Sequence, residues 1–224
     1  MAECLCLEDY QPRSELVVPE HPVSRARFPV VDAHNHVTYP GFGWQDRDVH
    51  QVLDELDALN VRTVVNLSGG SGDELKRNLE RWDLAFPGRF VSYCNADFAD
   101  IDAPGWSSRA CAQLRADIAA GARGLKVYKE LGLTYRDGAG RLFMPDDARL
   151  FDLWEQAGEL GIPVTIHTAD PVAFFRPLDR HNERWEELRR FPEWHFYGRD
   201  YPSFDALIES LYHLVETHPR TTFV

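Results

Sequence analysis

Two histidines separated by a single residue, His34 and His36, end an apolar segment with the sequence FPVVDAHNHV (residues 28–37). Its β-branched residues lead directly into Asp32, which is typical of a strand that ends in polar side chains. Because side chains alternate between the faces of a strand, the two imidazoles point the same way and could bind one divalent metal ion, with Asp32 orienting one of them from behind. The alternative is that both histidines are only polar residues at the start of a loop.

The elements that must position this pair alternate regularly between strand and helix. After the first strand, apolar runs predict strands over residues 61–67, 90–95, 122–128 and 162–166, with a further strand starting at 221–224. Helical spacing of apolar residues predicts helices over residues 46–60, 73–86, 106–120, 145–160 and 204–218. Asp46 is the expected N-cap of the first helix, and Pro145 suits the first turn of the fourth. This alternation indicates parallel βαβ units, in either a doubly wound sheet or a (β/α)8 barrel.

A third histidine, His167, directly follows the predicted strand 162–166, as His34 and His36 follow the first strand. In a closed barrel the first and fifth strands lie on opposite walls, and long side chains at their carboxyl ends converge over the axis. An open sheet would hold them too far apart. The sequence therefore predicts an α/β fold of the (β/α)8 TIM-barrel type, with a metal site formed by these three histidines.

Composition excludes several other classes of protein. The 224 residues contain 36 acidic side chains against 24 Lys and Arg, which gives a net charge of −12 and argues against nucleic acid as a partner. No apolar run approaches the roughly 20 residues that a membrane-spanning helix needs. The first residues are acidic where a signal peptide would be basic and then apolar, so we expect a cytoplasmic protein. Four cysteines at irregular spacing do not form a disulfide framework.

Two segments stand apart from the alternation in what we expect to be a single barrel domain over residues 28–224. Residues 1–27 contain prolines and no sustained periodicity, which predicts an arm that wraps the domain or packs on a partner subunit in a homodimer. Residues 168–202 are rich in aromatic and charged side chains, which predicts a lid-like insertion over the strand ends. Within it, the side chains that could touch a substrate are His181, Arg184 and Trp185. The alternative is that its aromatic residues pack the insertion itself or a dimer contact.

With His34 and His36 after one strand, Lys126 inside the segment GLKVY, and His167 after the segment IPVTI, the chain resembles the amidohydrolase superfamily. It is most similar to the amidohydrolase-related branch that also contains metal-dependent decarboxylases such as aminocarboxymuconate semialdehyde decarboxylase. The resemblance runs from about residue 28 to the last residue, about the first two thirds of a barrel. It implies that the three histidines are ligands of a divalent metal ion, with zinc expected first.

The resemblance leaves the role of Lys126 open. In the binuclear members the lysine at this fourth-strand position is carbamylated and bridges two metal ions, whereas the mononuclear branch does without it. A buried lysine paired with an acid such as Glu130 or Asp32 is the alternative. The superfamily also uses a histidine ending the sixth strand and an aspartate ending the eighth, and neither position exists in these 224 residues. We therefore expect a fragment of a longer protein or a truncated gene product, whose expected catalytic residues lie beyond residue 224.

The function implied by the resemblance is a metal-dependent hydrolase, in which a metal-activated water attacks an amide, a lactone or another ester of a small-molecule substrate. The same motif suits the nonoxidative decarboxylation of a small carboxylic acid. A third interpretation is a metal-binding protein without activity, because the sixth- and eighth-strand residues are missing. Since a barrel without its last strands exposes two sheet edges, we expect these 224 residues alone to be inactive and poorly soluble.

Overall fold

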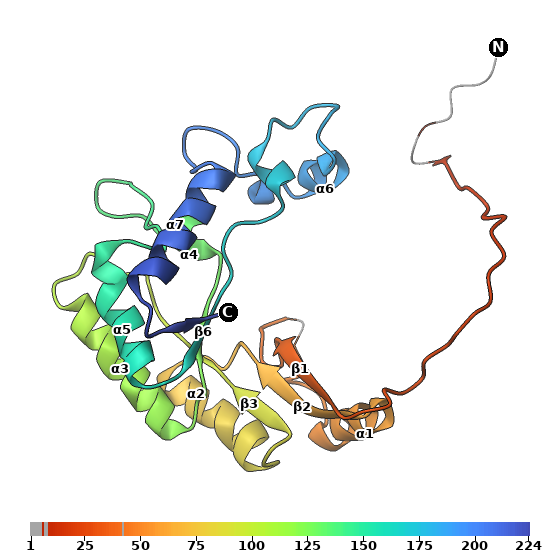
Figure 1. The fold of residues 1–224 in the computed structure, drawn as a ribbon, viewed down its shortest axis with the longest axis horizontal. Helices are drawn as coiled ribbons and strands as arrows, with labels where there is room; N and C mark the ends of the chain where they lie inside the picture. Colours follow the sequence, from red (N-terminus) through yellow and green to blue (C-terminus); the bar gives the residue numbers. More distant parts are fainter. Residues whose placement is uncertain (1–5, 7–8, 42) are drawn as a thin grey trace.

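A computed structural model describes residues 6, 9–41 and 43–224 of the chain. The strands of this part form two parallel sheets, drawn in Figure 1. The first sheet has the order β1 (Val30–Asn35), β2 (Val61–Asn66), β3 (Phe90–Ser92), and the second has the order β4 (Cys94–Asn95), β5 (Leu125–Val127), β6 (Pro163–Ile166), β7 (Thr222–Phe223). Each strand lies beside its neighbours in the sequence and the order never reverses. A doubly wound sheet contains such a reversal, so the order is that of an incomplete (β/α)8 barrel.

The predicted strand 90–95 is divided into β3 and β4 at Tyr93. The N–H of Tyr93 still donates to the carbonyl of Asn66 in β2, at 2.8 Å, whereas the N–H of Cys94 donates to the carbonyl of Gly124, at 2.9 Å. Successive residues thus bond alternately to the two sides, since Ser92 accepts from the N–H of Arg123 before β5 and the N–H of Asn95 donates to Gly70 after β2, both at 3.0 Å. The two sheets are therefore successive parts of one barrel wall.

Helices connect the strands. The long ones are α1 (Val49–Leu59), α2 (Gly72–Asn78), which continues as a π-helical turn over Leu79–Leu84, α3 (Trp106–Ala120), α5 (Phe151–Glu159) and α7 (Phe204–Thr217). Short helical segments in the loops are α4 (Glu130–Leu133), α6 (Trp185–Arg190) and 3-10 turns over Ala148–Leu150, Val172–Phe175 and Pro192–Trp194. None of the helices in the described ranges is long and apolar enough to cross a membrane.

Two predicted helix starts were wrong. The first helix begins at Val49, because the carboxylate of Asp48 rather than that of Asp46 accepts a hydrogen bond, from the N–H of His50 at 2.9 Å. The helix predicted from Pro145 begins as a 3-10 turn capped by Asp147. Pro145 lies before this turn, and its carbonyl accepts a hydrogen bond from the Trp154 indole at 3.2 Å.

Buried apolar side chains form three clusters. The largest lies between the strands and helices α3 and α5 and includes Leu114, Leu125 and Trp154. A second lies under α1 and contains Leu56, Val64 and Trp82. The third joins the insertion 168–202 to α7 and comprises Leu133, Ala169, Phe174, Phe175, Leu188, Phe196 and Leu207. Aromatic residues of the insertion thus pack among themselves and against α7. This agrees with the alternative in which these aromatic residues pack the insertion itself.

The described part of the N-terminal arm is exposed and lies apart from the domain over most of its length (Figure 1). Leu16 and Val17 are 77% and 94% exposed. The end of the arm is attached to the domain, where Arg25 donates to the carbonyl of Ala58 at 3.0 Å and the N–H of Ala26 donates to the carbonyl of Leu59 at 3.2 Å. Near its start, Cys6 lines a pocket with residues of the insertion such as Trp185. The packing of the arm on the domain or on a partner subunit stays a prediction.

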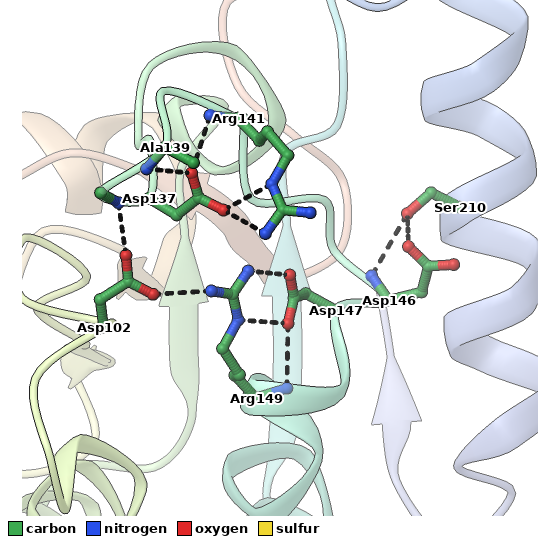
Figure 2. Close-up of polar contacts among 9 residues, drawn as sticks. Asp102, Asp137, Ala139, Arg141, Asp146, Asp147, Arg149 and Ser210 are labelled. Atoms are coloured by element: carbon green, nitrogen blue, oxygen red, sulfur yellow. Dashed lines mark hydrogen bonds and ion pairs between the residues drawn. The ribbon is translucent and has the colours of Figure 1, made fainter.

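Arg149 joins two loops that follow β4 and β5 (Figure 2). Its guanidinium donates to Asp102 at 2.6 Å and to both carboxylate oxygens of Asp147, at 2.6 and 2.8 Å. Asp102 in turn accepts a hydrogen bond from the N–H of Gly138 at 2.6 Å, and the guanidinium lies 4.0 Å from the centre of the buried Phe143 ring. These contacts hold together the two loops beside the carboxyl ends of the strands.

Candidate functional site

His34 and His36 lie next to one another where β1 ends. Their ring centroids are 5.4 Å apart, with the ring planes at 65°. Asp32, in the same strand, accepts hydrogen bonds from the N–H of His34 at 3.2 Å and from the side-chain amide of Asn35 at 2.8 Å. Its carboxylate therefore stabilises the end of the strand, and these hydrogen bonds do not include an imidazole ring.

The ring of His36 is held by a serine from the next strand end. Ser68 follows β2, and its Oγ forms a hydrogen bond of 2.7 Å with Nδ1 of His36. The same Oγ lies 2.8 Å from the hydroxyl of Tyr128, which follows β5 and donates to the carbonyl of Leu67 at 3.0 Å. Because Nδ1 is occupied, Nε2 is the nitrogen of His36 that remains available as a ligand.

The electrostatics of the site favour neutral imidazoles. Burial lowers the pKa of His36, and the positive charges of His34, Lys126 and His167 lower it further. Burial also lowers the pKa of His167, although Asp170 opposes this effect. These shifts follow from the side chains of β1, β5 and β6 acting on the same space. A neutral imidazole is the form that binds a metal ion.

Lys126 points into this space from β5 and is almost completely buried, with 2% of the residue exposed. Its Nζ lies 5.5 Å from the centre of the Tyr128 ring. Burial lowers the pKa of Lys126, and the charge of Glu130 counteracts that effect. Among the described residues Lys126 forms no ion pair, so the predicted pairing with Glu130 or Asp32 is not formed. One carboxylate oxygen of Glu130, Oε2, is itself buried without a hydrogen-bond partner in this part of the chain.

His167 follows β6, and its N–H donates to the carbonyl of Val127 at 3.0 Å. Its side chain is 45% exposed, and its Nε2 lies 4.0 Å from Oδ1 of Asp170. Within residues 6, 9–41 and 43–224, no three His, Cys, Asp or Glu side chains form a group arranged to hold a metal ion. The donor chemistry nevertheless fits a divalent ion, because imidazoles with lowered pKa values are present and Ser68 orients one of them.

The insertion residues predicted to touch a substrate make local contacts. The N–H of His181 donates to Asp179 at 2.8 Å, and Arg184 forms an ion pair with Glu187 at 3.2 Å. The ring of Trp185 is covered by the guanidinium of Arg189, at 4.7 Å. These contacts do not extend to the three histidines, and the substrate-binding role of His181, Arg184 and Trp185 stays a prediction.

A cleft lies beside His36 and is built from residues that sequence reasoning missed. Its walls come from the loops after β1, β2, β4 and β5, and they include Thr38, Tyr39, Ser68, Asn95, Asp97, Tyr128 and Tyr135. Most of these residues come shortly after a predicted strand, and polar side chains at such places are typical of barrel active sites. Their position after a predicted strand was the signal that could have identified them. For Ser68 this signal was obscured, because Ser68 begins a segment rich in glycine.

Comparisons with solved structures place the fold. The chain is similar to a 2,6-dihydroxybenzoate decarboxylase from Rhizobium, with 17% identity, a TM-score of 0.50 and 88% of this chain covered. It is also similar to a putative amidohydrolase from Staphylococcus aureus, with 14% identity, a TM-score of 0.51 and 86% of this chain covered. The chain spans 65% of the length of each of these two proteins. At this level of identity the similarity concerns the fold alone.

Comparisons of sequence identify the family. The search of curated proteins found no match to the chain. The family model described as amidohydrolase matches residues 31–224, which include β1 apart from Val30, strands β2 to β7 and all three histidines. Because that match covers most of the sequence, the chain belongs to the amidohydrolase family.

Proposed function

We propose that this chain supplies three ligands of a metal-dependent hydrolase, namely His34, His36 and His167. The observation that supports this proposal best is the state of His36. Its Nδ1 is fixed by Ser68 at 2.7 Å, and its pKa is lowered by burial and then by His34, Lys126 and His167. A histidine held in this way is prepared to act as a metal ligand through Nε2.

His34, His36 and His167 would hold a divalent ion, for which zinc is the first choice, and the bound ion would supply the Lewis acidity needed to activate water and polarise a carbonyl group. The chain's own residues prepare the site for that chemistry. Ser68 holds the ring of His36, Tyr128 holds Ser68, and burial lowers the pKa of Lys126, which favours its neutral amine. Carbamylation requires that neutral amine, so Lys126 remains a candidate for a further ligand in carbamylated form.

The cleft beside His36 would hold the substrate. Its polar and aromatic walls, with Tyr39, Asn95 and Tyr128 among them, suit a small polar molecule. We propose hydrolysis of an amide, a lactone or another ester there. Nonoxidative decarboxylation of a small carboxylic acid is the competing reaction, because the same ligands serve both.

Metal content tests the ligand set directly. We expect elemental analysis of the purified protein to find a stoichiometric divalent metal, and His36→Ala and His167→Ala to lose most of it. His181→Ala is the matched control, because His181 lies in the insertion and should keep the metal. Metal that is retained at full stoichiometry in His167→Ala would show that this histidine is not a ligand.

The reaction is tested with two panels of substrates. Lactones, esters and amides form one panel, and aromatic or enol carboxylic acids form the other. Hydrolysis on the first panel supports the proposal, whereas release of carbon dioxide alone would replace hydrolysis with decarboxylation. If the metal is bound but neither panel is turned over, the protein is a metal-binding one without activity.

A further inference from the structure

A pair of charged residues, Lys129 and Asp170, lies beside His167 at the start of the insertion 168–202. Lys129 follows β5 and Asp170 follows β6, so each belongs to the loop that leaves a strand end. Lys129 Nζ donates to Asp170 Oδ2 at 2.6 Å. The side chains are 30% and 11% exposed, which makes this pair better shielded from solvent than the pair of Lys76 with Asp73 on helix α2, whose side chains are 61% and 84% exposed. Ion pairs shielded in this way keep a defined geometry.

The two oxygens of Asp170 face different partners. Oδ2 accepts the hydrogen bond from Lys129, and Oδ1 lies 4.0 Å from Nε2 of His167. That distance is longer than a hydrogen bond, so the carboxylate acts on the ring through its charge. A negative charge on that side favours the tautomer with a proton on Nε2, which leaves Nδ1 as the nitrogen able to accept.

Lys129 is in turn held by the insertion. Its Nζ lies 6.0 Å from the centre of the Trp194 ring and 5.7 Å from that of the Phe196 ring. Phe196 belongs to the buried cluster that joins the insertion to α7, and its N–H donates to the carbonyl of Phe174 at 2.9 Å. Two aromatic faces and one carboxylate therefore define where the ammonium group lies.

We propose that Lys129 and Asp170 are positioning residues, which fix the tautomer and orientation of the His167 ring and couple them to the packing of the insertion. The packed insertion places Lys129, Lys129 holds Asp170, and Asp170 faces Nε2 of His167. This inference rests on the proposed function only where it concerns metal binding. The effect on the His167 ring is expected in the metal-free protein as well.

Nitrogen NMR of the metal-free protein tests the effect on the ring. The protein is labelled with ¹⁵N-histidine, and the His167 ring signals are assigned by their loss in His167→Ala. We expect the parent protein to show the tautomer protonated on Nε2. Asp170→Asn and Lys129→Met should move the His167 signals towards a mixture of tautomers, whereas Lys129→Arg should restore the parent spectrum. Asp57→Asn is the control, because Asp57 lies on helix α1 and the substitution breaks its ion pair with Arg89.

Binding of Co²⁺, followed by its visible absorption, provides the second readout. We expect Asp170→Asn and Lys129→Met to weaken Co²⁺ binding about 10- to 100-fold and to shift the absorption bands. Trp194→Leu should have a smaller effect in the same direction, and it keeps the test informative if Asp170→Asn does not fold. The inference is wrong if the His167 ring spectrum is unchanged in Asp170→Asn. If Asp170→Asn does not fold, an unchanged spectrum in Lys129→Met has the same consequence.

The two readouts separate this inference from the proposed function. If the parent protein binds no Co²⁺ but Asp170→Asn still changes the His167 tautomer, the positioning role holds and the metal site fails. If Co²⁺ binds to the parent and Asp170→Asn changes neither the ring signals nor the affinity, the metal site holds and the positioning role is wrong.

Discussion

Ser68 controls the orientation of His36, because its Oγ is hydrogen-bonded both to Nδ1 of His36 and to the hydroxyl of Tyr128. We expect Ser68→Ala to weaken metal binding about 10-fold, since a ligand whose ring is free to rotate binds less well. Tyr128→Phe is the matched variant, because it removes one bond to Ser68 and leaves the bond between Ser68 and His36. Titration with Zn²⁺ would measure both affinities, and equal losses in the two variants would contradict this explanation.

Asp83 gives the folded protein a predictable pH dependence. Its carboxylate accepts hydrogen bonds from the N–H and the Oγ of Ser92, at 2.7 and 2.8 Å, yet burial raises its pKa above the ordinary value of 3.8. A carboxyl group whose pKa is raised by folding stabilises the protein fully below its unfolded pKa, and that contribution is lost as the pH rises through the folded pKa.

Replacement of Asp83 by asparagine removes this titration. We therefore expect the parent protein to lose stability relative to Asp83→Asn as the pH rises from about 4 to about 7. Urea unfolding at both pH values measures the two free energies. Asp54→Asn is the control, because the side chain that it replaces is exposed on helix α1. A parent protein that gains stability relative to Asp83→Asn over that range would show that the hydrogen bonds from Ser92 outweigh burial.

At this scale the sequence could suggest the three histidines as ligands, which stays a prediction, but it could not suggest the residues that contact them. The spacing of His34 and His36 and the position of His167 after an apolar run are local signals, so they could be predicted. The contact between Ser68 and Tyr128 joins residues 60 positions apart, and it depends on how the strands are ordered in the barrel wall. Such a contact is a product of tertiary structure.

The elements themselves were largely predictable from periodicity. Short apolar runs and helical spacing identified the strands and long helices, because burial on one face imposes those periods. The helix start at residue 49 and the start of the 3-10 turn at residue 148 were missed, since several aspartates precede each of them and only the local geometry decides which one forms the cap. The loop between α4 and α5 folds around ion pairs, which leave no periodic signal.

Arg149 is the residue on which that loop depends (Figure 2). We expect Arg149→Met to destabilise the protein by about 1–3 kcal/mol, because it leaves Asp102 and the half-buried Asp147 without their cationic partner. Amide hydrogen exchange should quicken in residues 97–103 and 134–147 while the strands stay protected. Lys76→Met is the control, because it breaks the ion pair between Lys76 and Asp73 on helix α2, whose side chains are 61% and 84% exposed. Uniformly faster exchange across all strands would contradict a local role.

At the scale of the whole molecule, the most exposed apolar strand is β1, which lies at the edge of the first sheet. β1 pairs with β2 on one side and has no strand on the other side in the described part of the chain. Val31 is 58% exposed, and Phe28, just before the strand, is 69% exposed. An unpaired, apolar strand edge is a template for pairing with another chain.

We therefore expect the 224-residue protein to self-associate through β1, and Val31→Lys to shift it towards the monomer, because a charge at a strand edge opposes pairing. Folding stability should change by no more than about 0.5 kcal/mol, since an exposed side chain contributes little to packing. Light scattering after size-exclusion chromatography measures the association. Val17→Lys is the matched control in the exposed arm. If Val17→Lys produces the monomer and Val31→Lys does not, the arm rather than the sheet edge forms the contact between copies of the chain.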